Sequence, residues 1–437
     1  MKKVFFLPVA AALTFSLFLA MPAFLFAEEY SLDDLCRIAL ARSEKLKMSE
    51  ENLIIAETGK DKAFSYLLPR LTATGGYTRY SENKFTASGG VMQPDSAYTW
   101  EVRADETFSL SGRELTALGI SRQNITKSRH DLTAIREEYL LRYVAAAYYN
   151  CLIGRKNLDT AESNLQRLQK HRNAAEKRLK IGEVTKTALL RAEGELSGAK
   201  SDNLQAQNNL ELALAVLASN VGIREPFTLH DIPVEEAEIH ALAIFQEQAF
   251  ASRAELKSLD VQKQIAADRI LFMEGAYWPS VSVFGAYERS DQDPAGSSLN
   301  RESIYGGVAL SFPFFDGGLR KADVSEAKSR ERQAALQVED MKKEIDIEVR
   351  SAYLDVVTQK GILRFLNDQL LFARDNYNAV ERQFDFGLSN SLDVMDANTL
   401  LVSAERKVAS AIYNYQLSLL RMKKATGTLT ESMAGKQ

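Results

Sequence analysis

Proline is scarce in this sequence and unevenly placed. The 437 residues contain nine prolines, with none between Asp95 and Glu225 and none after Pro313. Globular domains are interrupted by proline and glycine every few tens of residues, so two tracts of this length predict unusually long helices. Both tracts are rich in Ala, Leu, Glu, Lys, Arg and Gln, which favour helices. A compact α/β enzyme is therefore not expected.

Cysteine and histidine are also rare. The two cysteines, Cys36 and Cys151, share no short-spacing motif with each other or with the four histidines, which argues against zinc and thioredoxin-type sites. We expect both thiols to be buried as small hydrophobic groups. The sequence also has no phosphate-binding glycine loop and no nucleophile elbow. It therefore predicts neither an enzyme nor a cofactor.

Charge of one sign is not in excess, and long hydrophobic runs are almost absent. Lys and Arg number 54 against 58 Asp and Glu, so nothing indicates a nucleic-acid partner. One apolar run, from Val4 to Phe26, follows two lysines and predicts a signal peptide over residues 1–27. Leu25 lies where a small residue is preferred before a cut after Ala27, so an uncleaved anchor is the alternative. No other run approaches the ~18 apolar residues of a spanning helix, so any further membrane insertion would use strands.

The rest of the chain is an internal duplication of one unit. Residues 39–79 match residues 249–289 at an offset of 210, and residues 112–222 match residues 317–427 at an offset of 205. The second match runs without a gap and includes two pairs of glycines, Gly182 with Gly387 and Gly222 with Gly427. Such self-similarity predicts two structural repeats, 28–236 and 237–429, followed by a short C-terminal tail, 430–437.

Each repeat begins with a helix and two strands. Ser31 and Asp34 form a capping pair for a helix that we expect to run to about Leu67. Apolar and charged residues then alternate in the strand 98–108, which is typical of a transmembrane strand, although a soluble hairpin shows the same alternation. The matching pair of strands lies in residues 281–290 and 304–315. The apolar face of the latter fits an offset of 206 better than 205, which predicts a bulge near Phe315 or a local alignment error.

A long helix, a turn and a returning helix complete each repeat. Ser111 and Glu114 fit a capping box, and Asp316 is the expected cap in the second half. From Arg113 to about Ile181 the first long helix would span roughly 100 Å at 1.5 Å per residue. Gly182 and Gly387 are expected to end the two long helices as C-terminal caps.

Four strands cannot close a membrane barrel within one chain, because closed barrels begin at about eight strands and open edges are prohibitive in lipid. The chain must therefore form oligomers. Two copies would give eight strands and a filled lumen, whereas three would give twelve and an aqueous channel. Helices continuous with such a barrel would extend the channel as a tube.

Three stretches carry a family resemblance. FFDGGLRKAD, AYLDVV and FDFGLSNSLDVMDANTLLVSAERKVASAIYNYQLSLLR make the chain similar to the TolC-like outer membrane efflux proteins, over essentially the whole mature length. The resemblance implies a mainly α fold with a β-barrel, arranged as a homotrimer with a twelve-stranded barrel in outer membrane lipid and a twelve-helix periplasmic tunnel. The implied function is the exit duct of a tripartite efflux pump or type I secretion system. Its implied partners are a periplasmic adaptor and an inner-membrane transporter.

The resemblance also assigns residues to the far end of the tunnel. Asp393 and Asp396 match the family's aspartates at the periplasmic entrance, where a trimer would gather six carboxylates into a cation-attracting ring. Phe384 and Ser389 belong to the gate neighbourhood. Ser389 stands where the family has a gate arginine and Ala188 where it has an aspartate, which leaves a salt-bridge latch of the family's kind in question. A plain solvated helix face is the alternative reading of the two aspartates.

The two turns resemble the family's adaptor-docking tips. The residues concerned are Gly182 and Glu183 in the first half and Gly387 and Leu388 in the second. Ordinary helix caps would use the same glycines and are compatible with docking.

A different function, that of a periplasmic coiled-coil adaptor or structural spacer, would also use long hairpins. The strand pairs with aromatic faces in both halves argue against it.

Overall fold

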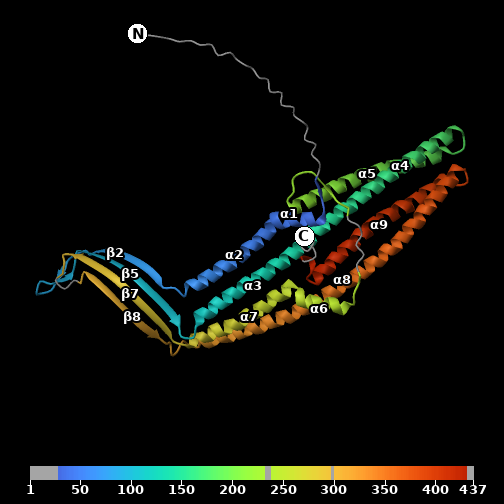
Figure 1. Ribbon diagram of the computed structural model, residues 1–437. Coiled ribbons are helices and arrows are strands. Elements are labelled where there is room, and N and C mark those ends of the chain that lie inside the picture. The colour runs from blue at the N-terminus through green and yellow to red at the C-terminus, as the bar shows by residue number, and fades with distance from the viewer. Residues whose placement is uncertain (1–27, 232–237, 297–299, 431–437) are drawn as a thin grey trace, which may run out of the picture.

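The computed structural model describes residues 28–231, 238–296 and 300–430. The predicted signal peptide, 1–27, lies outside these residues, as does nearly all of the predicted tail. The molecule is elongated, with a β-sheet at one end and two helical hairpins at the other (Figure 1). None of the described helices is long and apolar enough to cross a membrane.

Both halves have the same order of major elements. The first half contains β1 (Glu28–Tyr30), α1 (Leu32–Arg42), α2 (Glu44–Ser65), β2 (Arg70–Arg79), β3 (Lys84–Phe85), β4 (Val91–Gln93), β5 (Ser96–Ser109), α3 (Arg113–Tyr139), the π-helix η1 (Leu140–Ala145), α4 (Ala146–Lys180), α5 (Lys186–Val221) and β6 (Phe227–Leu229). The second half contains α6 (Leu242–Ser252), α7 (Ala254–Glu274), the short 3₁₀ helix η2 (Gly275–Tyr277), β7 (Ser280–Asp293), β8 (Glu302–Ser311), α8 (Leu319–Asp385) and α9 (Ser391–Ala425).

The first predicted helix is interrupted. The Ser31 and Asp34 capping box is confirmed, but the helix breaks at Ser43, which has extended backbone with φ −62° and ψ 124°. The second half breaks in the same way at Arg253, between α6 and α7, with φ −56° and ψ 123°. The returning helices end at these breaks. A Cβ on Gly222 after α5 would lie 3.3 Å from the Cβ of Arg42, and one on Gly427 after α9 would lie 2.9 Å from the amide nitrogen of Arg253.

The four long strands form one antiparallel sheet in the order β2-β5-β7-β8. Arg70 pairs with Asp105 in the first half, and Ser280 pairs with Ser311 in the second. Asp105 and Ser311 are therefore equivalent at an offset of 206. The β7–β8 pairing has no register shift and β8 ends at Ser311, so the expected bulge near Phe315 is wrong and the alternative, a local alignment error, is right.

The first long helical rod has one residue more than the second, and a π-turn accommodates this extra residue. The segments α3, η1 and α4 form one continuous helical rod over residues 113–180, while α8 is a regular helix of 67 residues. Gly112 and Gly318 precede the two rods, and Gly182 and Gly387 follow them. The interval from Gly112 to Gly182 is one residue longer than the interval from Gly318 to Gly387. In η1 the amide of Ala146 donates to the carbonyl of Leu141, five residues back. A turn of that kind holds one residue more than an α-turn.

Both rods begin after a left-handed glycine, but the side chains that precede this glycine make different contacts. The capping residue of α8 is Gly318, with φ 91°, two positions after the predicted Asp316, whose carboxylate accepts hydrogen bonds from the amides of Gly318 and Arg320 at 3.0 and 3.1 Å. The capping box expected at Ser111 is wrong. Gly112 is the capping residue, with φ 71°, and the Ser111 hydroxyl instead donates to the carbonyl of Gly275. A positive φ at Gly112 turns Ser111 away from the helix end.

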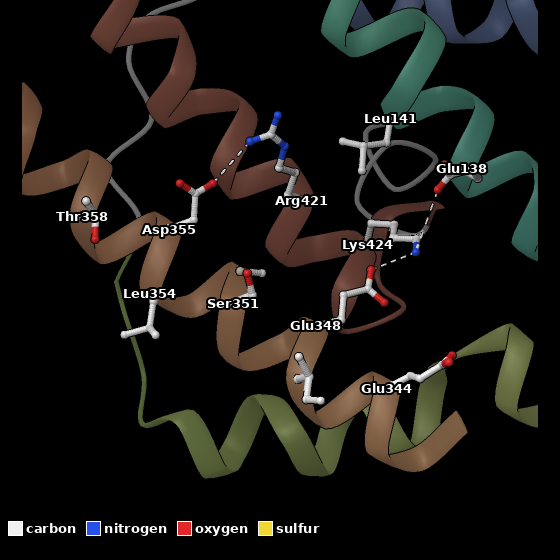
Figure 2. A pocket seen from close by; sticks show the side chains of 12 residues that line it. Glu138, Leu141, Glu344, Glu348, Ser351, Leu354, Asp355, Thr358, Arg421 and Lys424 are labelled. Carbon is white, nitrogen blue, oxygen red and sulfur yellow. Dashed lines mark hydrogen bonds and ion pairs between the residues drawn. The ribbon is translucent and has the colours of Figure 1, made fainter. Parts of the chain in front are cut away.

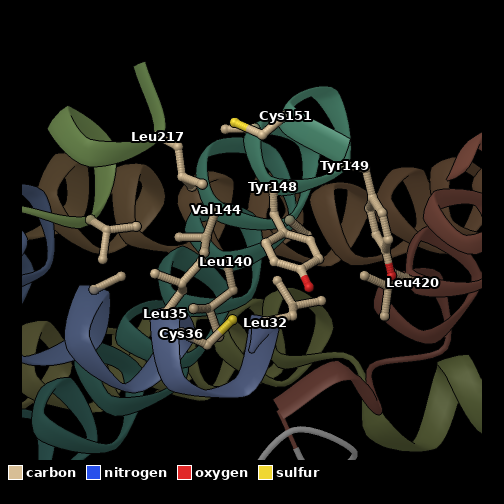
Figure 3. Close-up of a cluster of buried hydrophobic side chains, with 14 of the residues drawn as sticks. Leu32, Leu35, Cys36, Leu140, Val144, Tyr148, Tyr149, Cys151, Leu217 and Leu420 are labelled. Carbon is tan, nitrogen blue, oxygen red and sulfur yellow. The ribbon is translucent and has the colours of Figure 1, made fainter. Parts of the chain in front are cut away.

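The largest apolar cluster lies midway along the molecule, where α1 packs against η1 and the end of α5 (Figure 3). Leu140 and Val144 of the π-turn are fully buried there. Cys36 and Cys151 are buried in the same cluster, as the sequence predicted, and neither is part of a disulfide. Burial raises the pKa of each thiol to about 12, with repulsion from Asp33 contributing at Cys36. The thiols are therefore unreactive hydrophobic groups.

Candidate functional site

The two hairpin tips share one backbone geometry. Gly182 and Gly387 have φ of 81° and 73°, a conformation that L side chains rarely adopt. The amides of Gly182 and Glu183 donate to the carbonyls of Leu179 and Arg178 at 3.1 and 2.9 Å. The amides of Gly387 and Leu388 do the same to Phe384 and Gln383, at 3.0 and 2.8 Å. Both glycines thus end their helices in Schellman motifs, as predicted.

The side chains at the tips differ. Leu388 is 80% exposed and its neighbour Phe386 is 81% exposed, so the second tip presents bare apolar surface. At the first tip Ile181 is 70% exposed, while Glu183 lies 3.9 Å from the Arg178 guanidinium. A Schellman motif commonly has an apolar contact at this pair of positions, and the first tip has an ion pair there instead.

Asp393 takes part in the cap of α9. Its carboxylate accepts hydrogen bonds from the Asn390 amide at 3.1 Å and the Ser389 hydroxyl at 3.0 Å, while the Asn390 side chain accepts from the Asp393 amide. Ser389 therefore binds a predicted entrance residue locally. Asp396 lies almost one turn further, is exposed, and makes no hydrogen bond or ion pair with any described residue. The two aspartates are thus different: one has a structural partner and the other is free.

Phe384 is buried between the two hairpins. Its ring lies 5.0 Å from the His171 ring and 4.2 Å from the Arg178 guanidinium, both on α4. Its exposed fraction is 4%, so the side chain is a packing element and not a free gate residue. The sequence placed Phe384 near the gate but gave no sign of His171 or Arg178. These residues lie more than 200 positions away, and no local pattern marks them.

Further polar contacts join α4 to α9 along the same line. Asn398 donates to Asn164 at 2.7 Å, and Arg167 donates to Asn398 and Glu405 at 3.0 and 3.2 Å. The Arg167 and Glu405 side chains are both about one-fifth exposed, so this ion pair is shielded from solvent. These contacts fix the position of one hairpin relative to the other along the helix axes.

A groove of about 880 Å³ lies midway along the molecule, beside η1, α8 and the end of α9 (Figure 2). Most of its charged groups form ion pairs with one another: Lys424 contacts Glu348 at 2.9 Å and Glu138 at 3.9 Å, and Arg421 contacts Asp355 at 3.4 Å. Burial acts to raise the pKa of Glu348, but the bonds and charges of Lys424 and Arg253 outweigh it and lower the pKa. The groove is thus a structural ion network. No group of three metal-binding side chains occurs in the described ranges.

Comparison with known proteins gives a consistent result. The family model described as "Outer membrane efflux protein" matches residues 35–222 and 246–428. The outer membrane protein TolC of Vibrio cholerae serotype O1 is 23% identical over 405 residues, covering 88% of this chain and 89% of that protein. TolC of Escherichia coli K12 is 23% identical over 416 residues, covering 89% and 82%.

Solved structures show the same fold. The CmeC outer membrane channel of Campylobacter jejuni superimposes with a TM-score of 0.79 at 17% identity, over 91% of this chain and 86% of that one. The open state of the Neisseria gonorrhoeae MtrE outer membrane channel gives 0.75 at 21% identity, over 91% and 89%. The resemblance to TolC-like proteins is confirmed, as are the expectations of an outer membrane location and of a transport protein that is not an enzyme. The chain belongs to the outer membrane efflux protein family.

Proposed function

We propose that this chain forms a homotrimeric duct that passes substrates from an inner-membrane transporter and a periplasmic adaptor to the exterior. The observation that carries the proposal is the open sheet. Its edge strands, β2 and β8, have ten residues each and face no partner among the described residues. Exposed edges are not tolerated in lipid, and three sheets joined edge to edge make a closed barrel of twelve strands.

Exposed apolar side chains support a lipid-facing barrel. Tyr98, Trp100 and Val102 alternate with polar or charged residues along β5 and are 42–55% exposed. Val308 and Leu310 on β8 are 71% and 67% exposed. Three chains would supply an aqueous lumen, and α8, at 67 residues, would extend a tunnel roughly 100 Å beyond it.

The type of system is a separate question. The relatives include an alkaline protease secretion protein of Pseudomonas aeruginosa and cation efflux proteins of Escherichia coli. Both kinds fit a passive duct whose selectivity comes from its partners. The alternative of a periplasmic adaptor or spacer gains no support from the family match or from these relatives.

At the far end, we assign the entrance ring to Asp393 and Asp396 and adaptor docking to the two tips at Gly182, Glu183, Gly387 and Leu388. Exposed Leu388 and the free carboxylate of Asp396 support these roles. Three copies of Asp396 around a constriction would attract cations and repel anions. Ser389 would tune the ring only through its bond to Asp393.

The proposal is tested with the full chain purified from outer membranes in detergent. Native mass spectrometry should show a trimer, and planar bilayers should show discrete channels. Asp396→Ala should weaken block by a trivalent cation such as hexaamminecobalt(III) and alter conductance, while Glu195→Ala, which removes an exposed carboxylate from α5, should leave both unchanged. A monomer that is released without detergent would contradict the duct. Unchanged block in Asp396→Ala would remove that residue from the ring.

A further inference from the structure

The contact between the two hairpins combines apolar packing with polar contacts that cross from one hairpin to the other. Within the second hairpin the packing is apolar, through side chains such as Val394 and Leu401. Within the first hairpin it is also apolar, through Leu168 and Leu196. Between the hairpins, Met395 of α9 joins the first hairpin's apolar cluster, and hydrogen bonds are added to this packing near the tips. Polar contacts depend on protonation and charge, whereas apolar packing does not.

Arg178 of α4 binds the end of α8. Its guanidinium donates to the carbonyl oxygens of Phe384 and Asp385 at 2.7 and 3.1 Å and lies 3.9 Å from the Asp385 carboxylate. These carbonyls are among the last four of the helix, which lack partners inside it. A cation at a helix C-terminus is also favoured by the helix dipole. One side chain of the first hairpin thus completes a helix end in the second.

His171, two turns before Arg178 on the same helix, makes the second contact. Its Nε2 atom lies 2.9 Å from the Ser391 hydroxyl at the start of α9, and its ring packs on Phe384. Arg178 and His171 therefore hold both sides of the turn 386–390, one at the end of α8 and the other at the start of α9. Because this turn precedes Asp393, the pair also positions the start of the predicted entrance segment.

The charged groups around His171 oppose its protonation on balance. Burial, followed by repulsion from Arg178, lowers the pKa of His171, while Asp385 of α8 acts to raise it. From α9 the imidazole faces the neutral Ser391 hydroxyl, and the nearby Asp393 carboxylate is already bonded to Ser389 and Asn390. On α4, Arg172 is paired with Glu176, and with Glu193 of α5. Protonation would thus place a second half-buried cation near Arg178.

We propose that Arg178 and His171 form a clamp between the two hairpins and that protonation of His171 loosens it. At neutral pH the imidazole is uncharged and the clamp is closed. As the pH falls below the ordinary histidine value of 6.5, the separated form takes up a proton more readily than the closed form, so the closed form loses stability. The clamp lies within one chain and does not depend on the assembly of a duct.

Electron paramagnetic resonance distances test this directly. Nitroxides at exposed Lys170 on α4 and Leu400 on α9 would report the separation of the hairpins in the full chain, with Cys36 and Cys151 replaced by alanine. Dilution with unlabelled chain removes distances between copies. We expect a narrow distribution at pH 7.5 and a broader, longer one at pH 5. His171→Gln should give the narrow distribution at both pH values, and Arg178→Gln the broad one at both.

Two controls separate the clamp from general effects. Arg172→Gln removes an arginine whose partners all lie in its own hairpin, and His130→Gln removes a histidine on α3 whose pKa is also lowered by burial. Both should behave like the parent chain. If Arg178→Gln fails to fold, Arg178→Lys keeps the charge, loses the forked contact and should show intermediate broadening.

Distances that are the same at pH 5 and 7.5 in the parent chain would overturn the proposal, as would a pH response that survives in His171→Gln. Neither result depends on conductance. A chain that forms no channels but shows the expected distances would contradict the duct and leave the clamp intact.

Discussion

Two junctions midway along the molecule have the same backbone but different chemistry. In each, a returning helix ends in a left-handed glycine against a break between two helices, at Ser43 in the first half and Arg253 in the second. At the first junction the donors bind backbone carbonyls and not carboxylates: the Arg42 guanidinium donates to Gly222 at 3.0 Å and Tyr139 donates to Asn220 at 2.6 Å, beside the large apolar cluster. The second is held by charges, with Arg253 bound to Glu255 and Glu348 at 3.0 and 2.8 Å.

The comparison shows that the break in the helix does not depend on a particular side chain. The φ and ψ angles of Ser43 and Arg253 agree within a few degrees, although one residue is small and neutral and the other is a buried cation. The shared cause is the glycine that follows the returning helix, Gly222 after α5 and Gly427 after α9, because each of these glycines packs against the break. The side chains then decide how strongly, and at which pH, each junction is held.

Arg253→Ala should have the largest effect. Arg253 is 3% exposed, and its removal leaves Glu255 and Glu348 with Lys424 as their remaining close cation. Breaking a buried ion pair on one side lowers the free energy of unfolding by about 3–5 kcal/mol. Denaturant unfolding of the full chain in detergent, followed by circular dichroism, measures the loss. Ser43→Ala is the matched change at the other junction, and a loss below about 1 kcal/mol in Arg253→Ala would show that packing holds both.

Alanine substitutions at Gly222 and Gly427, the glycines that pack against the two breaks, should destabilise the two junctions to different extents. Either change forces an L side chain to a positive φ, which lowers stability by about 1–2 kcal/mol. Gly427→Ala also brings a Cβ within 2.9 Å of Ser252 and Arg253 backbone atoms, whereas at Gly222 the close neighbour is a side-chain atom of Arg42. We therefore expect about 3 kcal/mol at Gly427, including overpacking. Equal thermal shifts in the two variants would contradict this difference in closeness.

Acid should loosen the second junction before the first. The pKa of Glu348 is lowered from 4.5, because Lys424 and Arg253 outweigh the effect of burial. Its contribution to stability is present above pH 4.5 and is lost as the pH falls through the lowered pKa. Hydrogen exchange, corrected for intrinsic rates, should show earlier loss of protection at residues 248–258 than at 38–48. Simultaneous loss in both segments would indicate that the ion network is not responsible.

Ser43→Ala should have the smallest effect, and in the opposite direction. The Ser43 hydroxyl oxygen is buried and has no hydrogen-bond partner within the described ranges. Removing an unsatisfied buried hydroxyl should raise the free energy of unfolding by up to about 1 kcal/mol. The denaturation midpoint compared with Ser49→Ala, a change at another buried serine of α2, provides the check. A loss of stability would mean that the hydroxyl has an ordered water partner.

The sequence could predict features that depend on local pattern. The tip glycines, the Ser31 capping box and the alternating strands are determined by residues within a few positions of one another, and they appear as expected. The break at Ser43 could not be predicted, because its cause is the end of α5 about 180 residues away. The capping error at Ser111 has a similar origin, since a contact with Gly275 competes for its hydroxyl.

The candidate site was predictable only in part. Asp393 and Asp396 stand in one continuous motif and could be found from it, although their roles at an entrance stay a prediction. Their different states, one bonded and one free, emerge only from the cap geometry of Asn390. His171 and Arg178 carry no sequence signal, because their importance comes from a helix end in the other half.

The π-turn has a consequence for how a duplicated helix tolerates a change in length. Each residue of a regular helix advances the side-chain direction by about 100°, so one added residue would turn every later position away from its partner. In η1 the addition is absorbed within a single wider turn, and the 35 residues of α4 keep their angular phase. One of two copied coding segments can thus gain or lose a codon at this point while both hairpin tips keep facing the same way.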